Sequence, residues 1–305
     1  MEKHRKKLIK NAAVFDGHSS VLAQGKKIVI EDDIVTEITA DEVSEENFDE
    51  VFDGTGMVAM PGMTDAHVHM GCLFAKGEFP VDYATVLTVA KCKDALMAGF
   101  TTFRDAGSVS EGLKLAFDEG VLPGPRIYPC GAYISQTCGH GDSEYAHTYR
   151  DIQYRHPSST VLADGVPEII RAVREQFYRG ASHIKLMATE ILNRHEDIRL
   201  LFGTDMMITG PDYQVEQSED IRYYEKRFGT MRALRALTGT ANEVFALTTY
   251  QNPYPKGKIG VLEAGAFADL LLVDGDPTKR VSVLADTDHL RLIMKGGTVY
   301  KNTLC

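Results

Sequence analysis

The sequence predicts an α/β fold in which parallel strands alternate with helices. Three observations carry this prediction. Apolar, strand-like runs alternate with amphipathic segments from residue 58 onward, glycines follow the helical segments, and polar residues that are costly to bury end several of the apolar runs. Hydrophobic residues make up 44% of the 305-residue chain, which is ordinary for a globular protein with a sizeable core.

Composition narrows the class of protein. The net charge of -10 disfavours nucleic acid as a partner, because such binding calls for a basic patch. No apolar run approaches the ~18 residues of a membrane span, and the basic N-terminus lacks the apolar stretch of a signal peptide. The five cysteines are irregularly spaced and odd in number, which favours reduced thiols and a cytoplasmic location.

Both ends of the chain have β texture, and we expect them to form one small β-sandwich domain from residues 1–57 and 251–305. LIKNAAVFDG near the start and LIMKGGTVYKN near the end resemble each other, which suggests that the two termini pair. The acidic run DEVSEENFDE (41–50) is expected to be a solvated loop.

The body, residues 58–250, has the alternating pattern. Gly99 and Gly180 follow two of its helical patterns, and Pro167 lies near the start of one, as expected for helix ends. We expect helices at 81–99, 108–120, 165–180 and 228–247, the last with a break near Gly239, and strands at 100–107, 125–135, 181–189 and 198–205.

The stretch MTDAHVHMG, residues 63–71, places two histidines one residue apart at the end of an apolar run. Residues two apart in a β-strand point to the same face, so His67 and His69 are expected side by side. Two neutral imidazoles suit zinc and similar ions, although a tetrahedral site needs about four ligands. The alternative, one hydrogen-bonded core histidine and one facing solvent, stays open on these residues alone.

Two further ionisable residues end apolar runs. Lys185 lies inside HIKLMA and Asp205 ends LLFGTD, and each is costly to bury without a partner. Ligand-binding and catalytic residues of parallel α/β folds gather at the carboxyl ends of the strands, so one metal ion would account for both residues and for the histidine pair. A buried ion pair at Lys185 and a capping role for Asp205 are the open alternatives.

Taken together, these motifs resemble the amidohydrolase superfamily, in its prolidase-like and imidazolonepropionase-like branch. VAMPGMTDAHVHMG (58–71) is similar to the first barrel strand of that family, HIKLMAT (183–189) to the fourth and LFGTD (201–205) to the eighth. SQTCGHGD (135–142) resembles its Gly-His-Gly-Asp loop, and GKIGVLEAGAFADLLLVDGDP (257–277) resembles its C-terminal signature.

The resemblance implies a (β/α)8 TIM-barrel-type hydrolase that uses one or two divalent ions, zinc above all, to cleave carbon–nitrogen bonds. It implies a metal site formed by His67, His69, a carboxylated Lys185 and Asp205, with Asp205 as the catalytic proton acceptor.

The resemblance also implies substrate contacts at the mouth of the barrel. His140 and Asp142 of the Gly-rich loop would touch substrate, with a Gly-rich turn and an exposed imidazole as the open alternative. Independently of the resemblance, Tyr133 and Arg104 lie at or near predicted strand ends, where they would line the pocket. A zinc finger built from Cys130 and Cys138 is disfavoured by their spacing, and buried reduced thiols are the preferred interpretation.

The chain departs from the family pattern after Lys185. Residues 186–204 leave no room for strands five to seven, so we expect an incomplete barrel of about five strands, shorter than the ~250 residues of a full one. The lysine strand would then have to become a neighbour of the aspartate strand. The two histidines of the second metal position are missing; His183 and His195 are weak candidates to replace them.

The sequence therefore predicts a metal-dependent hydrolase acting on a small amide, a cyclic amide or a dipeptide. The rival hypothesis is a catalytically impaired remnant, or a splice or deletion product, that acts at most as an oligomeric scaffold. Unpaired sheet edges would favour a homo-oligomer in either case. A non-metal α/β binding protein is disfavoured by the coincidence of His67, His69, Lys185 and Asp205.

Overall fold

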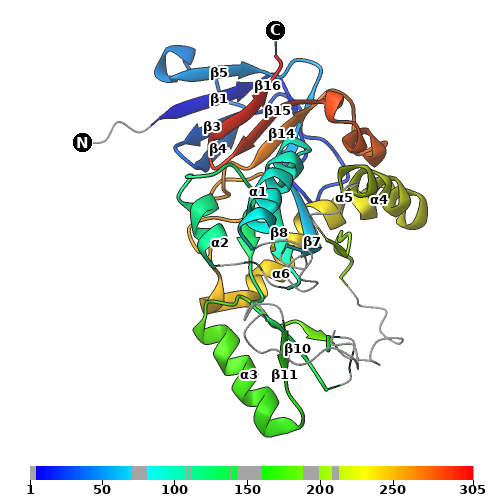
Figure 1. Ribbon diagram of the computed structural model, residues 1–305. Helices are drawn as coiled ribbons and strands as arrows, with labels where there is room; N and C mark the ends of the chain where they lie inside the picture. Colours follow the sequence, from blue (N-terminus) through cyan, green and yellow to red (C-terminus); the bar gives the residue numbers. More distant parts are fainter. Residues whose placement is uncertain are drawn as a thin grey trace.

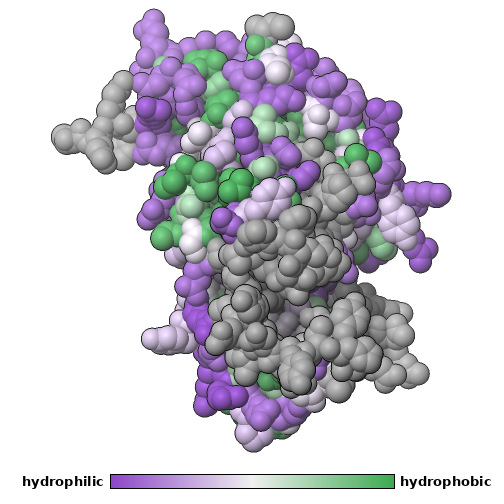
Figure 2. All heavy atoms as spheres, viewed as in Figure 1, coloured by the Kyte–Doolittle hydropathy of each residue, from purple (hydrophilic) through white to green (hydrophobic). Residues whose placement is uncertain are grey.

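The computed structural model describes residues 5–70, 81–107, 109, 111–137, 139, 141–142, 160–187, 199–207 and 213–304. Two β-sheets occupy one end of the molecule, a mixed α/β body lies in the middle, and a small unit around α3 lies at the other end (Figure 1). Hydrophilic side chains cover much of the sheet end (Figure 2). Within the described ranges, no helix combines the length and the apolar character needed to cross a membrane.

The first sheet at the terminal end comes entirely from the N-terminal part of the chain. Its strand order is β4-β3-β1-β5, with all contacts antiparallel except the parallel pair of β1 and β5. The strands are β1 (Lys6–Lys10), β3 (Lys27–Glu31), β4 (Ile34–Thr39) and β5 (Glu50–Asp53). Between β4 and β5 lies η1 (Glu45–Asn47), whose residues are not buried, as expected for the acidic run.

The second sheet combines strands from both ends of the chain in the order β16-β15-β14-β6-β2. The two similar end segments both contribute to this sheet but are not neighbours in it, because β2 lies at one edge and β15 and β16 lie toward the other. Side chains of both sheets, Ile28 and Leu272 among them, form one shared hydrophobic core. The strands are β2 (Ala13–Val14), β6 (Val58–Pro61), β14 (Leu270–Val273), β15 (Leu290–Lys295) and β16 (Thr298–Asn302).

The body contains two parallel sheets, which confirms the predicted parallel pairing. One has the order β13-β7-β8-β9, from β7 (Met63–His69), β8 (Phe100–Asp105), β9 (Arg126–Tyr128) and β13 (Met206–Met207). The other has the order β11-β10-β12, from β10 (Tyr133–Ser135), β11 (Thr160–Leu162) and β12 (Leu186–Met187). In the part of the chain that the structure describes, neither sheet closes into a barrel.

The expected pairing of the lysine strand with the aspartate strand is wrong. β12, next to Lys185, borders β10, whereas β13, next to Asp205, borders β7. The two ends of the shortened connection therefore belong to different sheets, and side chains rather than a shared ladder must bring Lys185 and Asp205 together.

The predicted helices are present. They are α1 (Val81–Met97), α2 (Glu111–Asp118), α3 (Val166–Tyr178), α5 (Thr230–Leu237) and α6 (Gly239–Phe245). Gly99 has a φ of 89°, so the turn after α1 needs a glycine. The sequence patterns missed α4 (Tyr213–Phe228) and the short helices η3 (Ala246–Gln251), η4 (Val281–Ala285) and η5 (Thr287–His289).

Two strand predictions need correction. The single strand expected at 125–135 is two strands, β9 and β10, in different sheets, because Pro129 lacks a ladder donor and Gly131 turns the chain with a φ of 69°. Residues 199–205 form no regular strand, since Asp205 has a left-handed φ of 55° that interrupts the ladder. Of the strand expected at 181–189, the described part contains only β12.

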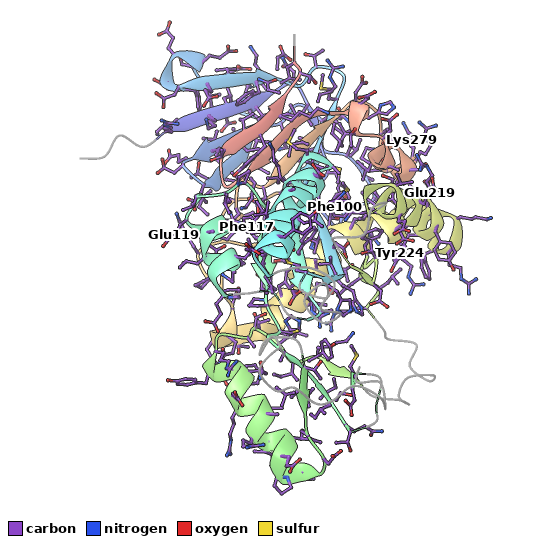
Figure 3. The ribbon with its side chains drawn as sticks, in the orientation of Figure 1. Phe100, Phe117, Glu119, Glu219, Tyr224 and Lys279 are labelled. Atoms are coloured by element: carbon purple, nitrogen blue, oxygen red, sulfur yellow. The ribbon has the colours of Figure 1, made fainter. Side chains whose placement is uncertain are left out.

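The main hydrophobic core joins β7 and β8 to α1, α4, α5 and the C-terminal segment. Phe100 and Tyr224 lie within the body, on β8 and α4 (Figure 3). Both rings contact Phe202, with centroids 5.8 Å and 4.9 Å away. Phe202 is fully buried, so it fixes the irregular segment 199–205 against β7 and β8.

Candidate metal site

β7 carries the histidine pair in the predicted arrangement. His67 and His69 stand two apart on the strand, and their rings lie 5.4 Å apart. The His69 side chain is 10% exposed and that of His67 is 32% exposed. The strand therefore places both rings together, with His67 the more exposed of the two.

Asp205 supplies a third group. Its Oδ1 lies 3.0 Å from His67 Nε2 and 3.1 Å from His69 Nε2. The three ligand atoms all lie within 4.8 Å of one another. Two imidazole nitrogens and a carboxylate oxygen that converge on one point are a donor set that zinc accepts, so the residues fit a divalent metal.

Lys185 reaches the same point from the other parallel sheet. Its Nζ lies 2.9 Å from His67 Nε2, and its carbonyl accepts a hydrogen bond from Ile134 N on β10. All four residues of the expected metal site are thus brought together, even though their strands do not form one sheet.

Burial governs the electrostatics of the cluster. Desolvation, with the nearby Lys185 charge second, lowers the pKa of His67 to about 4. His67 is therefore neutral near pH 7, which leaves a nitrogen lone pair for a metal ion. Burial also lowers the pKa of Lys185, and the Asp205 carboxylate opposes that shift.

Arg104 and His183 lie close to the cluster. Arg104 Nη1 donates to the carbonyl of Ala66, 3.1 Å away, on the histidine strand. His183 is half-buried, desolvation lowers its pKa to about 3, and its Nδ1 lies 2.9 Å from Ser182 Oγ. Among the described residues the metal cluster contains neither of these side chains, so His183 is not placed as a fourth ligand.

The expected substrate-binding residues are placed only in part. Tyr133 is buried near the histidines: a Cβ added at Gly107 would lie 2.6 Å from the Tyr133 ring and 3.4 Å from His69 Nδ1. Asp142 is half-buried in a turn in which its N–H donates to the carbonyl of Gly139. His140, His195 and Cys138 lie outside the described residues. Cys130 is a buried free thiol, as expected.

A cavity of about 540 Å³ lies elsewhere, between α2 and α3. Leu115, Gln176 and Arg179 are among its lining residues, and none of the four metal-site residues lines it. The chemistry of the side chains, not the size of a cavity, therefore identifies the candidate site.

Sequence reasoning missed three polar residues that support the site. Asp65 is fully buried, two residues before His67, and burial raises its pKa to about 6. It accepts hydrogen bonds from Thr204 Oγ1 and from Gln217 Nε2 of α4. Asp65 could have been found from the sequence, because a carboxylate within an apolar strand indicates a buried charge that needs partners. Gln217 could not, because the sequence did not predict α4.

Part of the chain is similar to a described protein family. Residues 58–198 match the model of the amidohydrolase family. The ochratoxinase of Aspergillus niger is 34% identical over 152 residues, a match that covers 43% of this chain and 31% of that protein. The chain thus matches about a third of the length of these curated relatives.

Solved structures show the same fold along nearly the whole chain. A crystal structure of an amidohydrolase gives a TM-score of 0.84 at 23% identity, covering 98% of this chain and 100% of that one. A prolidase complexed with N-methylphosphonate-L-proline gives 0.82 at 22% identity, covering 97% and 100%. The A. niger ochratoxinase structure gives 0.78 at 19% identity, covering 99% and 96%.

Proposed function

We propose that this chain, whose residues 58–198 match the amidohydrolase family, is a metal-dependent hydrolase of a carbon–nitrogen bond in a small amide, cyclic amide or dipeptide. The observation that carries the proposal is the convergence of His67 Nε2, His69 Nε2 and Asp205 Oδ1 within 4.8 Å. Two imidazole nitrogens and one carboxylate oxygen at this spacing are a donor set that zinc accepts, and this supports the proposal.

Zinc is the proposed ion, with His67, His69, Asp205 and a carboxylated Lys185 as its ligands. Two nitrogens and two anionic oxygens would complete the tetrahedral set that zinc prefers. Unmodified, the ammonium group of Lys185, 2.9 Å from His67 Nε2, would repel a divalent cation. Carboxylation would replace that positive charge with a negative one, and this supports the modified form.

The residues of the site have distinct proposed roles. Zinc, when bound, supplies Lewis acidity toward a carbonyl oxygen and toward water. Asp205 Oδ1 faces the histidines, which leaves Oδ2 of this 71% exposed side chain to take a proton from the attacking water. As the carbon–oxygen bond forms and the carbon–nitrogen bond breaks, Asp205 returns that proton to the leaving nitrogen.

The substrate is proposed to be an N-acyl amino acid or a dipeptide. The similar proteins include an ochratoxinase and a prolidase, and both names fit hydrolysis of a small molecule with an amide bond. Tyr133, His140 and Asp142 are the proposed substrate contacts, and the position of the Tyr133 ring next to His69 supports the first of these.

The architecture that would carry this activity is an internally shortened barrel. We propose a body at 58–250, flanked by a β-sandwich domain from 1–57 and 251–305, as an internally shortened form of the eight-stranded barrel. The two parallel sheets, which the described residues do not close, support this arrangement. The same shortening leaves one complete metal position, because residues 186–204 contain a single histidine, His195, where the second position needs two.

The rival candidate, a scaffold without turnover, has one observation in its favour. Lys185 Nζ lies within hydrogen-bonding distance of His67 Nε2, and an unmodified lysine at that position would prevent a metal ion from binding His67. Among the described residues, β12 and β13 each lie at the edge of a sheet, and self-association through these edges would suit such a scaffold.

Activity of the zinc-loaded protein decides between the two. The assay measures hydrolysis of a panel of N-acyl amino acids and Xaa-Pro dipeptides after zinc and bicarbonate are supplied, with Asp205→Asn as the matched control. Turnover by the wild type that falls by about 10²–10⁴-fold in Asp205→Asn supports the proposal. Zinc bound at one per chain with no turnover on any substrate favours the scaffold.

A further inference from the structure

The position of Asp205 depends on a carboxylate that is not itself a metal ligand. We propose that Asp65 is a positioning residue that, through Thr204, holds Asp205 against the His67–His69 strand. This inference rests on the proposed function in one respect, namely that Asp205 is a metal ligand.

The backbone around the site shows what Asp65 replaces. Ala66 N donates to the carbonyl of Phe202, 2.8 Å away, as in a parallel ladder. In a regular ladder the Ala66 carbonyl would next accept the N–H of Thr204. Instead the Ala66 carbonyl accepts a hydrogen bond from Arg104 Nη1, and Thr204 N donates to Asp65 Oδ1 at 3.3 Å. The carboxylate of Asp65 therefore stands in for the missing ladder acceptor.

Both oxygens of Asp65 are used in this way. Oδ1 accepts from His67 N at 3.2 Å as well as from Thr204 N. Oδ2 accepts from Thr204 Oγ1 at 2.9 Å and from Gln217 Nε2 at 3.2 Å. A fully buried carboxylate requires such donors, and here they come from β7, from the segment 199–205 and from α4. One side chain thus joins the three elements that surround the site.

The hydrogen bonds between Asp65 and Thr204 constrain the backbone of Asp205, the residue after Thr204. Asp205 has a left-handed φ of 55°, and its N–H donates to the carbonyl of His67, 2.7 Å away. A non-glycine residue keeps this conformation only where its surroundings enforce it. The conformation turns the Asp205 side chain so that Oδ1 lies 3.0 Å from His67 Nε2. Loss of the Asp65–Thr204 hydrogen bonds would allow the backbone of Asp205 to leave this left-handed conformation.

Glycine at position 203 allows the close approach. A Cβ added at Gly203 would lie 2.7 Å from the Cβ of His67 and 3.1 Å from its backbone nitrogen. The segment 199–205 therefore lies in close contact with β7. Because Gly203 has no side chain to pack there, the hydrogen bonds of neighbouring side chains determine the register of the segment.

The test uses Thr204→Val, which keeps the shape of the side chain and removes the hydroxyl donor. Thr204→Ser is the conservative variant, because it restores the donor. Thr55→Val is the matched control: it removes a threonine–aspartate bond of the same kind, from Thr55 Oγ1 to Asp53 Oδ1 at 2.6 Å, in the terminal sheet. Two quantities are measured, the zinc dissociation constant by chelator competition and the amide exchange rate of Asp205 in the metal-free protein.

The proposal predicts that Thr204→Val weakens zinc binding by about 10–100-fold, the range typical of residues that orient metal ligands. It also predicts at least about tenfold faster exchange at Asp205, as expected for local opening, with Thr204→Ser and Thr55→Val close to wild type. An unchanged exchange rate of Asp205 in Thr204→Val would overturn the proposal. So would Thr55→Val if it weakened zinc binding as much as Thr204→Val does. Failure of the wild type to bind zinc would instead contradict the proposed function, and the exchange rates would still decide the role of Asp65.

Discussion

The buried pair of Arg126 and Asp269 connects the body to the terminal sheets, and its removal gives a prediction that can be worked out in detail. Arg126 Nε donates to Asp269 Oδ2 at 2.8 Å, and Nη2 donates to Oδ1 at 3.2 Å. The side chains are 11% and 3% exposed. Asp269 Oδ1 also accepts the N–H of Gly296 at 2.6 Å.

The substitution Asp269→Asn keeps the shape and removes the charge. It leaves the guanidinium of Arg126 buried without its carboxylate, which typically costs about 3–5 kcal/mol. The Arg126 side chain also stacks on Phe267, 3.8 Å from the ring centroid, and so cannot easily turn to solvent. With a denaturant dependence of about 3 kcal/mol per molar urea, the midpoint should fall by about 1 M or slightly more.

Urea unfolding followed by circular dichroism measures this change, since the chain contains no tryptophan for fluorescence. The double variant Arg126→Met/Asp269→Leu serves as the control, because removal of both charges leaves neither unpaired; it should regain most of the lost stability. A loss below about 1 kcal/mol in Asp269→Asn, or a double variant less stable than the single one, would refute the reasoning.

Three further predictions concern the site and its surroundings. Gly203→Ala should weaken zinc binding by about 10–100-fold in chelator competition, because the new Cβ would meet His67 at 2.7 Å and push the segment away from β7; unchanged affinity would contradict this. Phe202→Ala should cost about 3–5 kcal/mol in urea unfolding, since the ring is fully buried, and a loss under about 1 kcal/mol would show that the segment contributes little to the core. Burial lowers the pKa of Lys295 to about 8 from 10.5, so between these values the unfolded chain holds a proton that the folded chain has lost. Stability relative to Lys295→Met should therefore rise with pH across that window, by about 3 kcal/mol in total, and a flat difference would contradict the burial argument.

The sequence predicted the elements whose patterns are local. The helix α1 was predicted because its apolar spacing ends at Gly99, which indeed has a positive φ. By contrast α4 is rich in charge and buries few residues, Gln217 and Ile221 among them, so its pattern resembles a solvated segment. Its role comes from contacts outside the helix: Tyr224 packs on Phe202, and Gln217 donates to Asp65, which is far away in the sequence.

The same distinction applies to the site. The pairing of His67 with His69 follows from strand geometry alone. The approach of Lys185 and Asp205 to that pair was predicted from their place at the ends of apolar runs and from resemblance to a family, because no local pattern specifies contacts between separate sheets. The left-handed backbone of Asp205 could not be predicted, since an aspartate after Thr204 is equally suited to a regular strand end or a cap.

Metal content per chain tests the central claim most directly. Elemental analysis of the monodisperse wild-type protein, beside the His67→Ala/His69→Ala variant, compares the site with and without its two nitrogen donors. We expect about one zinc ion per wild-type chain, because the four proposed ligands form a single site, and no zinc in the variant. Equal zinc in both proteins, or none in the wild type after zinc and bicarbonate are supplied, would contradict the account.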